Sequence, residues 1–108
     1  MKDGIYTVVF KSNLQSVGEG IVVVNRGMIH GADIAFTIRG KITHPVMELD
    51  VHYYNQDIPS VLGMKEDYSL EMHCREREEG HYHFYGHVKG EPSLKLDAYA
   101  VYINSILK

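Results

Sequence analysis

Residues 47–53 read MELDVHY, so an apolar side chain alternates with a polar one along the whole segment. A period of two is the period of a β-strand, because successive side chains of a strand point to opposite faces of its sheet. One face of this strand is therefore apolar and the other polar. This pattern is typical of an antiparallel sheet that packs one face on the core and exposes the other to water.

Other segments alternate in the same way or are rich in β-branched and aromatic residues, which favour strands. They are residues 4–10, 18–24, 28–30, 34–39, 68–75, 81–89 and 94–103. Residues 4–10 read GIYTVVF and are apolar in both registers, so we expect a strand buried on both sides. Gly18 and Gly20 indicate a bend or a close approach of another backbone. Residues 28–39 form two short strands or, as the alternative, one long bent strand.

These segments predict an all-β fold of about eight antiparallel strands, because no crossover helices separate them. Residues 58–63 are the one short segment that favours a helix, with Pro59 in its first turn and Gly63 at its exit. Closing a sheet on itself hides both its inner face and its edges. We therefore expect residues 1–108 to form one small up-and-down β-barrel, with the 58–63 segment capping one mouth. A flattened sandwich is the alternative.

The composition is that of an ordinary globular chain. Of its 108 residues, 44% are hydrophobic and 23% charged, and the formal net charge is −3. An acidic chain has no basic field to recruit a phosphate backbone, which disfavours direct nucleic-acid binding. The single cysteine, Cys74, forms no internal disulfide and fits a reducing compartment. No segment has the pattern of a signal peptide or a membrane helix, so we expect a cytoplasmic protein that does not bind membranes.

Seven histidines raise the question of a metal site, and His81 and His83 share one strand face. With His73 on the preceding strand, opposite His83 if the hairpin register matches, they are the weak candidates for metal ligands. Alternation places these side chains on the polar outer face beside Arg75, where histidine is ordinary. We expect no metal and no cofactor. Cys74 shares its face with apolar residues, as an inert thiol does, and no nucleophile motif is present, so we expect no enzyme.

The tyrosines are more informative, because most of them fall in the apolar register of a strand. Core packing is the simpler interpretation, and a cavity for one small apolar ligand is the second. The candidate interior site comprises Tyr6, Val8, Tyr53, Tyr68, Tyr82, Phe84 and Tyr102. On the outer face, Tyr99, Val101 and Ile103 form an apolar row that marks a dimer or partner surface if it is exposed. The same row could instead pack under the terminal residues 106–107.

Several segments, in order, resemble one known family and cover nearly the whole chain. They are MKDGIY at 1–6, GEGI at 18–21, GADIA at 31–35, IPSVL at 58–62, DYSL at 67–70, HVKG at 87–90 and LDAYA at 96–100. Together they are similar to the GrlR-like regulators of type III secretion loci. The resemblance implies a lipocalin-like barrel, usually a homodimer, that acts as a negative regulator of transcription by sequestering a helix-turn-helix activator.

One segment departs from the family pattern. The family's acidic Glu-Asp-Glu-Asp run, which engages the activator, has no counterpart here, because residues 43–47 read THPVM. Glu48 and Asp50 are the nearest acidic residues and join the candidate partner surface. We expect a regulatory barrel that binds a protein partner. A small-molecule carrier or sensor that uses the tyrosine-lined interior is the alternative.

Overall fold

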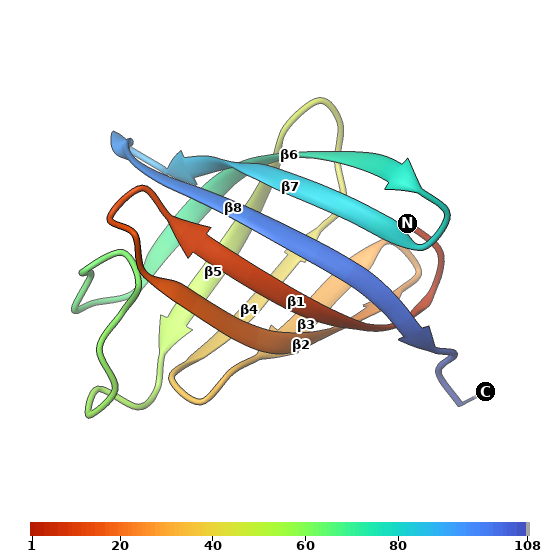
Figure 1. Ribbon diagram of the computed structural model, residues 1–108, viewed down its shortest axis with the longest axis horizontal. Helices are drawn as coiled ribbons and strands as arrows, with labels where there is room; N and C mark the ends of the chain where they lie inside the picture. The colour runs from red at the N-terminus through yellow and green to blue at the C-terminus, as the bar shows by residue number, and fades with distance from the viewer. Residues whose placement is uncertain (108) are drawn as a thin grey trace.

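The computed structural model describes residues 1–107, and its strands form a closed antiparallel barrel. Each strand pairs with the next along the chain, and the last strand pairs with the first (Figure 1). The eight strands are β1 (Gly4–Ser12), β2 (Val17–Asn25), β3 (Met28–Ala32), β4 (Phe36–Lys41), β5 (Met47–Tyr53), β6 (Tyr68–Glu78), β7 (His81–Val88) and β8 (Glu91–Asn104). The predicted up-and-down barrel is confirmed, and the sandwich alternative is wrong.

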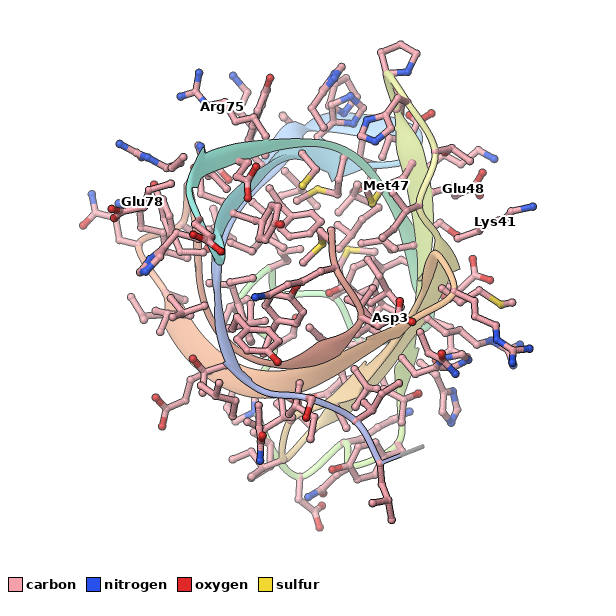
Figure 2. All side chains as sticks on the ribbon, turned by 90° about the vertical axis from the view of Figure 1, so that its right-hand side faces the viewer. Asp3, Lys41, Met47, Glu48, Arg75 and Glu78 are labelled. Atoms are coloured by element: carbon pink, nitrogen blue, oxygen red, sulfur yellow. The ribbon has the colours of Figure 1, made fainter. Side chains whose placement is uncertain are left out.

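The alternation read from the sequence sorts the side chains correctly between the barrel interior and the solvent. In β5, every second residue from Met47 to Tyr53 is buried, and the residues between them are exposed. Figure 2 shows Met47 pointing into the barrel and its neighbour Glu48 pointing away from it. The interior is thus a single apolar core, which the inner faces of all strands share.

Residues 28–39 form two strands, β3 and β4, and not one bent strand. The turn between them is held by Asp33, whose carboxylate accepts hydrogen bonds from the backbone N–H groups of Ala35 and Phe36, each at 2.7 Å. The carbonyl of Phe36 in turn accepts a hydrogen bond from the Asp33 N–H at 2.9 Å. Asp33 therefore ends one strand and starts the next.

The expectation that residues 4–10 are buried on both sides is wrong. The side chains of β1 that point into the barrel are buried or half-buried. On the outer wall, however, Thr7 is exposed and Val9 is 47% exposed. The physical reason is that the barrel wall is one layer thick, and no other element packs against the outside of β1. Apolar residues in both registers of this strand therefore leave apolar side chains in water.

The helix expected at 58–63 is also wrong, although the segment does cap a mouth of the barrel. Its backbone forms a turn in which the Gly63 N–H donates to the Ser60 carbonyl at 3.1 Å. The segment is too short to sustain a helix nucleus, and its backbone forms hydrogen bonds with residues of the barrel rim instead. Ser12 donates a hydrogen bond to the Val61 carbonyl at 2.7 Å, and Leu62 is buried at 2% exposure.

Strand β2 has unequal neighbours on its two sides. It pairs with β1 from Val17 to Val24, but with β3 only from Ile21 to Asn25. A two-residue turn joins β2 to β3, and both turn residues have positive φ, 53° at Arg26 and 76° at Gly27. Because β3 is short, the first residues of β2 extend past its end. Among residues 1–107, no helix is long and apolar enough to cross a membrane.

Candidate functional site

The barrel encloses an apolar cavity of about 100 Å³. It lies in the half of the barrel toward the Asp33 turn, and Val8, Phe10, Phe36, Tyr68 and Leu96 are among the side chains that line it. Two of the predicted interior residues, Val8 and Tyr68, therefore face this space. An engineered cavity of about 150 Å³ holds a molecule the size of benzene, so this cavity alone holds only a very small apolar group.

Three other predicted interior residues fill the opposite half of the barrel. The Tyr6 ring packs edge-on against Tyr82 and Tyr102, with ring centres 5.9 and 5.6 Å apart. The Tyr6 hydroxyl donates to the Lys2 carbonyl at 2.7 Å, and the Lys2 ammonium lies 3.9 Å above the Tyr102 ring. Burial, together with the neighbouring tyrosines, raises the pKa of Tyr6 to about 12. This cluster is core packing, as the simpler interpretation expected.

The last two members of the predicted interior site, Tyr53 and Phe84, are buried and lie outside the cavity lining. Tyr53 stacks on Phe36 with ring centres 4.5 Å apart, and its hydroxyl donates to the Ile58 carbonyl, which ties the capping segment to the wall. Burial raises the pKa of Tyr68 to about 12. These tyrosines thus stabilise the capped mouth.

A larger hollow of about 700 Å³ opens beside the start of β2; we call it the side hollow. The outer residues Val9, Val17 and Ile34 and the inner residues Phe10 and Phe36 are among its lining, so it passes through the wall where β3 has ended. Phe10 and Phe36 also line the interior cavity. The side hollow was not predicted from the sequence. Its one sequence signal was the pair Gly18 and Gly20, which indicated an irregular wall at this point.

The predicted apolar row of β8, which we call the β8 row, consists of Tyr99, Val101 and Ile103. All three residues belong to the outward register of β8, and Ile103 is 52% exposed. Of the terminal residues that could cover the row, Leu107 is fully exposed and Ile106 is half-buried. Val9 lies directly across the ladder from Tyr99 and extends the apolar surface onto β1.

Glu48 and Asp50 lie on a different part of the wall, because β6 and β7 separate β5 from β8. The structure therefore does not bring them together with the β8 row. Glu48 accepts a hydrogen bond from the Lys89 ammonium at 3.1 Å and stands opposite Glu71 in the β5–β6 ladder. The hydrogen bond to Glu48 raises the pKa of Lys89. Asp50 accepts a hydrogen bond from the Ser69 hydroxyl at 3.1 Å.

Two histidines of this sheet region, His73 of β6 and His83 of β7, stack on tyrosine rings. His83 stacks on Tyr99 with ring centres 4.6 Å apart, and its Nε2 lies 2.8 Å from an Asp97 carboxylate oxygen. His73 faces Tyr85 and not His83, because β6 continues to Glu78 and a two-residue turn leads into β7 at His81, so the ladder is displaced by two residues from the register that the sequence suggested. Within residues 1–107, no three His, Cys, Asp or Glu side chains are placed to hold a metal ion.

Cys74 lies in the inward register of β6, where it is partly buried and packs against the core. Burial raises the pKa of its thiol, so the thiolate is scarce at neutral pH. In this position Cys74 acts as a small apolar side chain.

Comparison with known proteins assigns no family. No protein-family model matches the sequence, and no curated protein matches it. Membership of the GrlR-like family therefore remains a prediction, based on the ordered segments between residues 1 and 100. The barrel's own surfaces have to supply the functional evidence.

Proposed function

We propose that this protein is a non-enzymatic regulatory barrel of the cytoplasm, which forms a homodimer and sequesters a protein partner. The GrlR-like resemblance makes that partner a helix-turn-helix transcriptional activator. The observation that carries the proposal is the β8 row, an outward apolar stripe in which Ile103 is exposed and Tyr99 and Val101 are half-buried, and which continues across the ladder to the exposed Val9 on β1. Exposed apolar stripes of this kind mark association surfaces in proteins that are otherwise polar outside.

The β8 row is the dimer surface in this proposal. A twofold interface uses the same patch on both subunits, so a self-complementary apolar row is well suited to it. The rings and branched side chains of Tyr99, Val101 and Ile103 bring large apolar area with little conformational freedom to lose. The outer faces of β5 and β6 carry mainly polar and charged groups and stay free for a partner.

The partner surface is the acidic wall of β5 and β6. Glu48 and Glu71 stand opposite each other there, with Asp50 beside Glu48 along β5. Lys89 pairs with Glu48, and Arg39 stands opposite Asp50 in the β4–β5 ladder. DNA-binding domains carry basic surfaces, and an acidic wall attracts such a surface electrostatically. Glu48, Asp50 and Glu71 thus take the place of the acidic run that the family carries elsewhere.

Light scattering of the purified protein tests the dimer. We expect a dimer for the native chain and a monomer for Val101→Lys, because the new charge would be desolvated at the centre of the row. Thr37→Lys, at an exposed outer position of β4, is the matched control and should stay dimeric. A native chain that remains monomeric at high concentration contradicts the proposal, and so does a dimer that Val101→Lys leaves intact.

Titration calorimetry tests the partner, with purified helix-turn-helix activators of the same organism as the probes. The double variant Glu48→Gln, Asp50→Asn should bind at least about tenfold more weakly, because charged pairs at an interface contribute both to affinity and to association rate. The variant should retain the melting temperature of the native chain. Unchanged binding, or no binding by the native protein, contradicts this assignment.

A small apolar ligand in the barrel is the second candidate, and the interior cavity of about 100 Å³ is the observation that favours it. The cavity shares Phe10 and Phe36 with the side hollow, so the hollow is a route to it from solvent. Native mass spectrometry under mild conditions should then detect a bound apolar molecule, which Val8→Trp excludes by filling the space. Identical spectra of the native chain and Val8→Trp would dispose of this function.

A further inference from the structure

Residues Val17–Gly20 of β2 form an interval of strand edge that has a strand neighbour on one side only; we call it the β2 edge. On one side, these residues pair with Lys11–Val8 of β1. On the other side, the last pair with β3 joins Ile21 to Ala32, and the chain then turns away at Asp33. A strand edge without a neighbour presents backbone N–H and C=O groups to whatever approaches it.

The register identifies which groups are presented. Asn25 and Met28 close the two-residue turn, so they exchange the first hydrogen bonds of the β2–β3 ladder. Hydrogen-bonding residues recur at every second position, so Asn25, Val23 and Ile21 direct their N–H and C=O groups toward β3. Continuing the same series past the end of β3, Glu19 and Val17 direct theirs toward the β2 edge. Gly18 and Gly20 bond to β1 instead.

These backbone groups lack an internal partner within residues 1–107. No backbone hydrogen bond joins Val17 or Glu19 to the Asp33 turn or to the capping segment, and no side chain bonds to them either. An extended polypeptide is the natural complement of two donors and two acceptors in strand spacing. The backbone chemistry thus favours a peptide over a compact ligand.

The side hollow provides space for the side chains of such a peptide. It lies along the β2 edge, and Phe10 and Phe36 form part of its inner wall. At its rim, Val17 is 67% exposed and Ile34 is 70% exposed. Glu19 is exposed in the outward register of β2. The hollow is therefore apolar within and acidic at this point of its outer rim.

We propose that the β2 edge binds an extended segment of a partner protein, which adds as a short strand beside Val17–Gly20. Every second side chain of that segment is apolar and enters the side hollow, and the side chains between them are basic and lie near Glu19. The added strand occupies the position beside β2 that β3 leaves vacant after Ala32. This site goes beyond the proposed dimer and acidic surfaces and does not depend on either of them.

A second copy of this chain does not fit the β2 edge. If two β2 edges paired around a twofold axis, the inner register would bring Gly18 and Gly20 of one copy beside the same glycines of the other. Glycine has no side chain to fill a hollow of about 700 Å³. A larger residue is barred at Gly18, because its Cβ would lie 2.6 Å from the Phe10 ring. The occupant must therefore bring large side chains of its own.

Hydrogen exchange of the free protein tests the edge itself. We expect the amides of Val17 and Glu19 to exchange rapidly, and those of Gly18 and Gly20, which bond to β1, to be protected. Protection of all four amides would show that the edge is already satisfied and would overturn the proposal. This measurement needs no ligand and no variant.

Capped hexapeptides in which lysine alternates with valine, leucine or phenylalanine are the probes for binding. In NMR titrations we expect at least one of them to shift the Val17 and Glu19 amide signals and to slow their exchange. The matched control peptides carry N-methyl groups on alternate amides, which removes the hydrogen bonds without removing the side chains, and they should not bind. Equal binding of methylated peptides would indicate a merely apolar site and would overturn strand addition.

Two substitutions at one position separate the backbone from the charge. Glu19→Pro deletes an edge N–H and leaves the hydrogen bonds to β1 in place, so it should weaken binding of the hexapeptide at least about threefold. Glu19→Ala keeps the N–H and removes only the charge, so it should weaken binding of the hexapeptide less than Glu19→Pro does. If Glu19→Pro lowers the melting temperature, its effect on binding cannot be separated from unfolding. The methylated peptides then decide whether binding depends on backbone hydrogen bonds. Failure of every hexapeptide to bind overturns this proposal, and Val101→Lys then still tests the dimer separately.

Discussion

At the scale of single residues, tyrosine combines two properties that this barrel uses. Its ring fills interior space, and its hydroxyl satisfies a backbone group at the rim. Tyr6 shows both, because its ring packs between Tyr82 and Tyr102 while its hydroxyl bonds to the Lys2 carbonyl. Tyr53 bonds to the Ile58 carbonyl at the other end. These two tyrosines thus attach the N-terminal segment and the capping segment to the wall.

Buried tyrosines predict a loss of stability in alkali. The pKa values of Tyr6 and Tyr68 lie near 12 in the folded chain, against about 10 in the unfolded chain. The folded state therefore favours the protonated form, and this contribution is fully present below pH 10 and is lost as pH rises from about 10 to 12. Urea unfolding at pH 8, 10 and 11 should show a falling midpoint.

The control for this prediction is Tyr6→Phe, which cannot ionise at that position. Its midpoint should fall less between pH 10 and 11 than that of the native chain. Absorbance at 295 nm should also show that Tyr6 and Tyr68 ionise after the exposed tyrosines. A native chain whose tyrosines all ionise near pH 10 while it is still folded contradicts the prediction.

At the scale of elements, the segment between β5 and β6 acts as a cap, although it has no regular secondary structure. Leu62 is its anchor, with only 2% of its surface exposed. The polar bonds from Ser12 to Val61 and from Tyr53 to Ile58 hold the backbone over the mouth. A loop can therefore close a barrel when its few contacts are all satisfied.

Leu62→Ala should lower the free energy of unfolding by about 2–5 kcal/mol, because it removes a buried side chain and leaves a cavity under the cap. Leu14→Ala is the matched control, since Leu14 is 52% exposed in a neighbouring loop. Its effect should lie within about 0.5 kcal/mol of zero. Denaturant unfolding followed by circular dichroism measures both variants, and equal effects would refute the anchoring role of Leu62.

At the scale of the whole molecule, the barrel depends on pairing between its two most distant strands. β1 and β8 pair from one end of the barrel to the other, as the red and blue ribbons lying side by side in Figure 1 show. This ladder removes two long edges that an open sheet would expose. Free intervals remain only where neighbouring strands differ in length within residues 1–107, as at the β2 edge and along residues 73–78 of β6, which pair with β7 but not with β5.

Truncation tests this closure. A chain ending at residue 90 lacks β8 and leaves β1 and β7 each with one free edge, so it should lose cooperative unfolding and associate in gel filtration. A chain ending at residue 104 keeps every strand and should unfold cooperatively, as the full chain does. A cooperative, monomeric product from the shorter chain would show that the barrel does not need its closing strand.

Part of the candidate site follows directly from the sequence. The outward register of Tyr99, Val101 and Ile103 was predicted from alternation alone, and Ile103 is indeed exposed. The side hollow was not predicted, because it depends on β3 ending at Ala32 while β2 continues back to Val17. No local pattern in either strand reports the length of its neighbour.

The sequence by itself determined which side chains of each strand face inward, because a strand alternates whatever it pairs with. Only the tertiary structure decided which strands meet and in what register. The two-residue turn between β6 and β7 placed His73 opposite Tyr85, and the pairing of β1 with β8 joined residues from the two ends of the chain. The physical reason is that side-chain direction is set by local backbone geometry, whereas pairing is set by contacts between residues distant in the chain.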